Sequence, residues 1–264
     1  MKDLLTRQVV SRIGPFPPSR YVPILMYHQI RHTPDGKEFP GLYVSPETFE
    51  RQVIFFLKKG FRGISLDELL AGTPTAGTIL RKTFVITFDD GYLDNYTNAF
   101  PILLKHGLSA TVFIVSDYVG ERKCWGTRNG THLMTWSQAR EMSKHRISFQ
   151  SHTCTHPDLT KLDLKSALPE LKDSKIKIED ALGVPVWHFA YPFARYDKRT
   201  IELVREVGYQ SACAGTFSHA GKFCIERFEC SNDLSRKFKM EAHAWYRRLR
   251  LTWHKLRITY DANC

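Results

Sequence analysis

The chain lacks any run of about 20 apolar residues, which is the length that a membrane-spanning helix requires. Its first residues, MKDLLTRQ, also lack the uninterrupted apolar segment of a secretory signal peptide. We therefore expect a cytoplasmic protein, or one that binds a membrane peripherally, without a transmembrane helix.

Cysteine is present without a recognisable pattern, because none of the six cysteines in 264 residues form a CxxC pair. The spacing suggests no disulfide framework, so we expect reduced thiols that are mostly buried. Internal repeats and low-complexity tracts are also absent from the sequence. With 42% hydrophobic residues the chain can bury a full core, and α/β barrels of this size fold as one domain.

Negative charge is scarce, since 27 acidic residues stand against 38 lysines and arginines, for a formal net charge of +11. This excess fits an acidic polymer, a nucleic acid or a membrane surface as partner, or a solvated basic surface. Much of it lies in residues 235–264, where tryptophans and leucines mix with basic residues. We expect a basic amphipathic helix there, either packed on the fold or lying on an anionic membrane. No nucleic-acid-binding motif is present, so nucleic acid is not expected as a partner.

Apolar strands alternate with amphipathic helices along most of the chain. Residues 1–20 are expected to form an N-terminal arm, because several prolines there oppose regular structure. The hydrophobic pattern then predicts strands at 22–27, 61–65, 83–88, 110–115, 146–150, 186–190 and 209–213. Helices are predicted to start at Ser45, Ser65, Asp94, Thr135, Leu164 and Asp197. Those that start at Ser45, Asp94, Leu164 and Asp197 are expected to end at Gly60, Gly107, Gly183 and Gly208, respectively. The alternation predicts an α/β protein with a parallel sheet or barrel.

Chemically versatile side chains follow directly after several predicted strands. The segment TFDDGY (87–92) ends one strand, His28 ends another, and His152 and His156 follow a third. Ligand sites of parallel α/β folds lie at the carboxyl ends of their strands. We therefore expect these residues to meet at one edge of the fold.

The two adjacent carboxylates, Asp89 and Asp90, can do different work, because neighbouring side chains that leave a strand diverge. Asp90 can bind a metal while Asp89 faces an attacking water. The alternative is a plain turn, since Asp-Gly is common turn chemistry. The spacing of His152 and His156 arises by chance at this histidine content, so their position after a strand, rather than their spacing, favours a ligand pair.

A carboxylate and two imidazoles can hold a divalent metal and leave a position open for water. A second carboxylate can take a proton from that water, and a further histidine can return one to the leaving group. This set of residues indicates a metal-dependent amide hydrolase. Simpler alternatives exist for two members: His28 could be a packed or capping histidine, and the segment 191–193 could be a rigid strand exit rather than an oxyanion site.

Together these residues resemble the polysaccharide deacetylase family, also called the NodB homology domain or carbohydrate esterase family 4. TFDDGY at 87–92 and SHTCTHPDL at 151–159 are similar to that family's first two motifs, and the resemblance extends over residues 21–234. It implies a distorted (β/α) barrel with fewer than eight regular units. It also implies a hydrolase that removes N-acetyl groups from a polysaccharide, oligosaccharide or glycolipid and releases acetate.

The resemblance further implies a role for each site residue. Asp89 is the general base, and the metal ligands are Asp90, His152 and His156. The metal is expected to be one Zn²⁺ ion, although the same ligands accept Co²⁺ or Ni²⁺. The residues expected to bind the oxyanion or the substrate are Phe193, through its backbone N–H, Tyr191 and Tyr92.

The sequence departs from the common family pattern at two places. The third motif usually begins with an arginine that pairs with the base, but here Ala190 and Tyr191 precede Pro192. No C-terminal Leu-x-His motif is present to supply the acid. Instead, LMYH at 25–28 is similar to the N-terminal motif of the circularly permuted branch that deacetylates poly-N-acetylglucosamine, which assigns the acid role to His28.

Two alternatives to carbohydrate deacetylation stay open at this point. A catalytically inactive carbohydrate-binding protein could share the fold, although every expected ligand and both proton-transfer residues are present. A metal hydrolase of another amide or of an ester would form the same tetrahedral oxyanion, so the motifs do not separate it from a deacetylase.

Overall fold

The computed structural model describes residues 22–33, 42–71, 82–123, 130–216, 221–233 and 238. The expected N-terminal arm lies outside these residues, as does the expected basic helix apart from Phe238. The strands are β1 (Ile24–Tyr27), β2 (Gln29–Ile30), β3 (Tyr43–Val44), β4 (Arg62–Ile64), β5 (Thr83–Asp90), β6 (Ala110–Ile114), β7 (Arg122–Lys123), β8 (Thr131–His132), β9 (Ile147–Ser151), β10 (His188–Ala190), β11 (Ser211–Cys213) and β12 (Phe228–Glu229). The helical segments are α1 (Pro46–Lys58), α2 (Leu66–Leu70), η1 (Asn95–Ala99), α4 (Phe100–Lys105), η2 (Ser116–Tyr118), α5 (Trp136–Ser143), η3 (Leu159–Lys161), α6 (Leu164–Leu182), η4 (Pro192–Ala194) and α7 (Lys198–Glu206).

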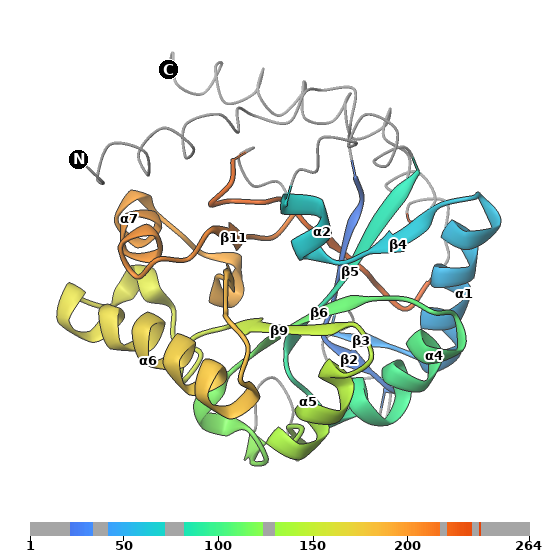
Figure 1. Ribbon diagram of the computed structural model, residues 1–264, viewed down its shortest axis with the longest axis horizontal. Coiled ribbons are helices and arrows are strands. Elements are labelled where there is room, and N and C mark those ends of the chain that lie inside the picture. Colours follow the sequence, from blue (N-terminus) through green and yellow to red (C-terminus); the bar gives the residue numbers. More distant parts are fainter. Residues whose placement is uncertain are drawn as a thin grey trace, which may run out of the picture.

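All strands of the large sheet run parallel, in the order β11-β10-β9-β6-β5-β1-β12, with β4 also paired to β5. A further parallel bridge joins Cys213 of β11 to Ile225, just before β12. The hydrogen-bonded neighbours therefore form a ring, which residues 225–229 close by pairing with β11 on one side and with β1 on the other. Helices α1, α4, α5, α6 and α7 surround this sheet (Figure 1). The predicted distorted α/β barrel is confirmed.

The side chains of β5 alternate between two cores. Phe88 packs in the larger core, which lies between the sheet and the outer helices. Val85 packs in a smaller core that draws residues from β1, β4, β6, β10 and β11 and is closed by α2, as expected for the inside of a barrel. Successive residues of a strand point to opposite faces. Asp89 therefore shares the inner face with Val85, whereas Asp90 follows Phe88 in the alternation toward the outer face.

The helix ends agree with the predicted caps. At the start of α1, the Thr48 N–H donates to Ser45 Oγ at 3.2 Å, and the end of α6 is followed by Gly183 at φ 69°. Both are local arrangements that depend on a few neighbouring residues. Among the described residues, no helix combines the length and apolar character needed to cross a bilayer.

The helix predicted over 94–106 differs from a regular α-helix. It begins as a π-helical segment, η1, in which the Phe100 N–H bonds to the oxygen of Asn95, and continues as α4. Pro101 has no N–H to donate, so the regular hydrogen-bond ladder cannot run through this point. Such π segments often occur at functional sites, and η1 adjoins the end of β5.

The main core extends past residue 234, where the domain was expected to end. Phe238 is 1% exposed, and its ring centroid lies 6.0 Å from those of Phe55 and Phe56 and 5.8 Å from that of Phe228. Phe238 therefore packs β12 against α1 and belongs to the folded domain.

We expect Phe238→Ala to lower the free energy of unfolding by about 3–5 kcal/mol, because it removes a buried ring and leaves a cavity. Phe193→Ala is the matched control, since Phe193 is 60% exposed. Urea unfolding of the metal-free variants, followed by circular dichroism, measures both changes. Equal stability of the two variants would show that Phe238 contributes little to the fold.

Candidate metal centre and active site

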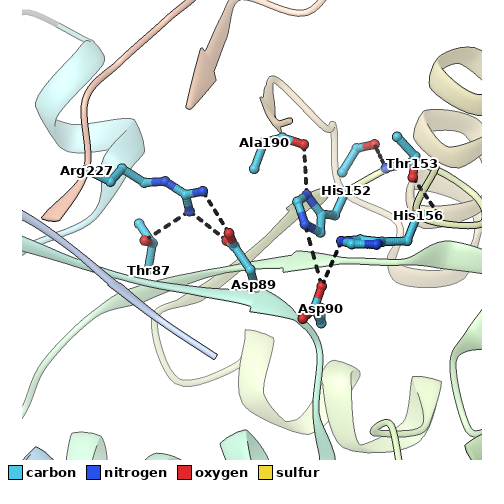
Figure 2. A network of polar contacts seen from close by, with 9 residues as sticks. Thr87, Asp89, Asp90, His152, Thr153, His156, Ala190 and Arg227 are labelled. Atoms are coloured by element: carbon cyan, nitrogen blue, oxygen red, sulfur yellow. Dashed lines mark hydrogen bonds and ion pairs between the residues drawn. The ribbon is translucent and has the colours of Figure 1, made fainter. Parts of the chain in front are cut away.

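Asp90, His152 and His156 meet at the carboxyl ends of β5 and β9, which are separated in the sheet by β6. Their ligand atoms all lie within 4.8 Å of one another. Asp90 Oδ1 is 3.5 Å from His152 Nε2 and 3.3 Å from His156 Nε2 (Figure 2). A tetrahedral ion with bonds of about 2.1 Å separates its ligands by about 3.4 Å, so this spacing fits a single ion.

Left-handed backbone conformations occur at the ends of both ligand-bearing strands. Asp90 has φ 72° and Gly91 has φ 76°, so the chain turns sharply as β5 ends. Glycine is required at 91, because a Cβ there would lie 2.7 Å from Cγ1 of Ile114. In the second motif, Thr153 and His156 have φ 71° and 62°. Residues with side chains adopt this conformation at a cost in energy, typically at functional sites.

Hydrogen bonds and burial set the protonation of the ligands. His152 Nδ1 donates to the oxygen of Ala190 at 2.8 Å, which leaves the Nε2 lone pair facing Asp90. Burial lowers the pKa of His152 and of His156 to about 4, so both rings are neutral at pH 7. Burial raises the pKa of Asp90, whose Oδ1 is buried without a hydrogen-bond partner among the described residues. Three electron-rich atoms that face one another in this way fit a divalent cation.

Tyr92 contacts a metal ligand. It is 2% exposed, and burial together with the nearby charge and hydrogen bond of Asp90 raises the pKa of Tyr92. In that hydrogen bond the Tyr92 hydroxyl is the donor and the Asp90 carboxylate is the acceptor. A direct contact between Tyr92 and substrate stays a prediction.

The second carboxylate, Asp89, is paired with Arg227 inside the barrel. Arg227 Nη1 donates to Asp89 Oδ1 at 2.6 Å and Nη2 donates to Oδ2 at 2.7 Å, and the arginine is 1% exposed (Figure 2). Its Nε donates to the oxygen of Ala214 at 3.0 Å, and Nη1 also reaches Thr87 Oγ1 at 3.3 Å. Burial by itself would raise the pKa of Asp89, but the charge of Arg227 and the arginine hydrogen bonds hold it well below its usual range. Asp89 is therefore an ionised acceptor at neutral pH.

Arg227 supplies the charge partner that the third motif lacks, and the sequence analysis missed it. It lies in the segment 225–229 that closes the ring of strands, 138 residues along the chain from Asp89. The signal in the sequence is weak: a basic residue between apolar Ile225 and Phe228, in a segment too short to be recognised as a strand.

His28 lies at the end of β1, within electrostatic reach of the other site residues. A proton on His28 would favour the ionised forms of Asp89 and Asp90 and disfavour a proton on His156. Its Nδ1 is buried without a hydrogen-bond partner among the described residues. His32, which repeats the ligand-pair spacing with His28, has a side chain that is 73% exposed and pairs with a separate carboxylate. His32 therefore lies outside the site.

Side chains of η1 and the residue before it hold the backbone around His28. Asn95 Nδ2 donates to the oxygen of His28 at 2.7 Å. Asp94 Oδ1 accepts the Ile30 N–H at 2.8 Å, and Asn98 Nδ2 donates to the oxygen of Ile30 at 2.7 Å. Burial raises the pKa of Asp94 to about 7. These residues tie the expected acid to the end of β5, and sequence reasoning missed them because nothing local marks a contact between such distant segments.

Phe193 lies at the rim of the metal centre, whereas Tyr191 lies in the core. The Phe193 ring is 60% exposed, and its centroid is 4.7 Å from that of His156. Its φ is 57°, and its N–H has no acceptor among the described residues, as an oxyanion donor requires. Tyr191 is 1% exposed and donates its hydroxyl to the oxygen of Phe223 at 3.0 Å. Its contacts therefore give no support to a role in binding substrate.

The chain belongs to the polysaccharide deacetylase family, whose profile matches residues 76–212. YxkH of Bacillus subtilis (strain 168) is 32% identical over 189 residues, which are 72% of this chain and 62% of that protein. A poly-beta-1,6-N-acetyl-D-glucosamine N-deacetylase of Staphylococcus aureus (strain MRSA252) is 28% identical over 163 residues, which are 58% of this chain and 54% of the relative. The chain thus spans between 54% and 62% of the length of these relatives.

Solved structures share the fold over most of this chain. The deacetylase PplD of Streptococcus pyogenes, in complex with acetate, has a TM-score of 0.73 at 27% identity, covering 84% of this chain and 97% of that one. A de-N-acetylase of Aggregatibacter actinomycetemcomitans has a TM-score of 0.71 at 18% identity, covering 84% and 99%, and this likeness shows the fold alone. The family expected from the sequence motifs is confirmed.

We expect each chain to bind one divalent ion. Titration of chelator-treated protein with Zn²⁺ in a calorimeter should give one site. Loss of an outer-shell partner typically costs about 10–100-fold in metal affinity. His152→Ala should weaken Zn²⁺ binding by more than this, because it removes a ligand. His32→Ala, which changes an exposed histidine, should bind like the wild type. Unchanged affinity in His152→Ala would contradict the assigned ligand set.

We expect Arg227→Met to lower the free energy of unfolding at pH 7 by about 3–5 kcal/mol, because it leaves Asp89 buried and unpaired. The folded-state pKa of Asp89 lies below its unfolded value of about 3.9, so the pair's contribution is present above about pH 4 and is lost as the pH falls further. The stability difference between wild type and variant should therefore shrink below about pH 4. Denaturant unfolding at several pH values measures it, and a pH-independent difference would indicate a packing effect alone.

Proposed function

We propose that this protein is a metal-dependent hydrolase that removes N-acetyl groups from polymers of N-acetylglucosamine and releases acetate. The observation that carries the proposal is the ligand set of Asp90, His152 and His156 beside the Asp89–Arg227 pair. The substrate class is supported by the name of the Staphylococcus aureus relative, and the product by the acetate in the PplD complex.

The reaction follows from the roles of the residues around the ligand set. The three ligands would hold one divalent ion, expected to be Zn²⁺, which polarises an acetamide carbonyl and lowers the pKa of a water toward about 7. Asp89, kept ionised by Arg227, takes a proton from the attacking water. The Phe193 N–H donates to the oxyanion as the carbonyl carbon becomes tetrahedral. Protonated His28 gives its proton to the nitrogen as the C–N bond breaks, so one water is consumed and acetate and a free amine leave.

The rim of the site suits a sugar ring. The exposed face of Phe193 stands next to His156 and offers an apolar surface against which a pyranose can pack. Tyr92 acts behind the metal through Asp90, so substrate contact falls to Phe193 on the open side. In this proposal an N-acetyl group lies over the ligand set while the rest of the polymer stays outside.

Acetate release from N-acetylglucosamine oligomers tests the proposed function. The wild type should release acetate, a chelator should stop the release, and added Zn²⁺ should restore it. Asp89→Asn should lower kcat by about 10²–10⁴-fold because it removes the general base, while binding one ion as the wild type does. Asp180→Asn, at an exposed position on α6, is the matched control.

Two results would contradict parts of this proposal. Near-normal turnover by metal-loaded Asp89→Asn would overturn the assignment of the base. Wild-type protein that binds Zn²⁺ but cleaves only an acetyl ester, and no acetamide, would replace the deacetylase by an ester hydrolase.

A further inference from the structure

The backbone between the two histidine ligands is held by one carboxylate from a helix. The N–H groups of Cys154 and Thr155 each donate to Glu170 Oε2 at 2.9 Å, and the Thr155 hydroxyl donates to Glu170 Oε1 at 2.6 Å. Glu170 lies on α6. A single side chain thus accepts three hydrogen bonds from the loop that joins His152 to His156.

The N–H groups of the ligands themselves have other acceptors. The His152 N–H bonds to the oxygen of Ile114 at 3.0 Å, and the His156 N–H bonds to Thr153 Oγ1 at 2.9 Å. The two N–H groups accepted by Glu170 have no other acceptor among the described residues. Removal of this carboxylate would therefore leave both without a partner in a partly buried loop.

The loop needs such support because it is strained. Thr153 and His156 have φ values of 71° and 62°, which persist in residues with side chains only where the surroundings hold them. His156 stands at the end of this strained segment, and its Nε2 must stay near Asp90 Oδ1, from which it is separated by 3.3 Å. A loop that relaxed would move this nitrogen away from the carboxylate.

We propose that Glu170 is a positioning residue of the metal centre. It fixes the loop so that His152 and His156 present their nitrogen atoms to the same ion, and it acts through the backbone rather than as a ligand. This inference rests on the metal site of the proposed function.

Three variants of α6 separate positioning from general stability. Glu170→Ala removes all three acceptor contacts. Glu170→Gln can still form three hydrogen bonds to the loop. Its amide oxygen can accept both N–H groups, and its NH₂ can donate to the Thr155 hydroxyl oxygen. Glu179→Ala is the matched control, since Glu179 also accepts a backbone N–H, that of Val186 at 2.9 Å, and pairs with Lys175, but lies away from the ligands.

The dissociation constant for Zn²⁺, measured by competition with a chromophoric chelator, is the decisive readout. We expect Glu170→Ala to weaken Zn²⁺ binding about 10–100-fold, as loss of outer-shell support does, and Glu170→Gln and Glu179→Ala to bind like the wild type. Urea unfolding of the metal-free proteins measures the stability of each variant in parallel. Lower stability of metal-free Glu170→Ala with unchanged Zn²⁺ affinity would overturn the proposal, as would equal weakening in Glu179→Ala.

Further measurements distinguish a failure of the Glu170 positioning role from a failure of the proposed deacetylase function. If Glu170→Ala does not fold without metal, Glu170→Asp replaces it, because the shorter side chain withdraws the carboxylate; wild-type affinity in that variant would overturn the positioning role. Wild-type protein that binds no Zn²⁺ would overturn the proposed function together with this inference. The remaining case is that the wild type binds Zn²⁺ and releases acetate, and Glu170→Ala binds Zn²⁺ with equal affinity. That result would overturn this inference alone.

Discussion

The buried ion pair between Asp89 and Arg227 joins an inner strand of the sheet to the segment that closes the barrel. Its arginine comes from the segment 225–229, which pairs with β11 on one side and with β1 on the other. A buried carboxylate without its partner is strongly unfavourable, so the inner face of β5 is satisfied only when this segment is in place. Closure of the barrel and the pairing of Asp89 with a cation therefore depend on the same segment. Phe238, which packs against β12 from outside, reinforces the same closure.

Two adjacent carboxylates acquire opposite properties because a strand directs them to opposite sides. Asp89 faces the barrel interior, where Arg227 holds its pKa low, although burial opposes this. Asp90 turns through a left-handed conformation toward two neutral imidazoles, and burial raises its pKa. The first is held ionised, and the second faces the position where a cation would bind. This division of labour follows from strand geometry and local charge rather than from any difference in chemistry.

Each residue of the candidate metal site is supported by a different part of the fold. The oxygen of Ala190, at the end of β10, orients His152, and Tyr92 orients Asp90. Glu170 of α6 holds the loop that carries His156. The departure in the third motif is therefore compensated in space: Ala190 and Tyr191 precede Pro192 without the usual arginine, and Arg227 reaches Asp89 from another segment of the chain.

The sequence by itself predicted the helix starts, the alternation of strands with helices, and that the residues of the candidate metal site would lie together. Capping residues such as Ser45 and Gly183 depend only on near neighbours, so α1 and α6 begin and end where predicted. The rule that parallel strands share their carboxyl edge was enough to bring Asp90 together with His152 and His156. Only the tertiary structure decided that Arg227 pairs with Asp89 and that Glu170 holds the histidine loop. Such contacts depend on which faces the closed sheet and its helices bring together, and hydrophobic periodicity carries no information about pairing between distant segments.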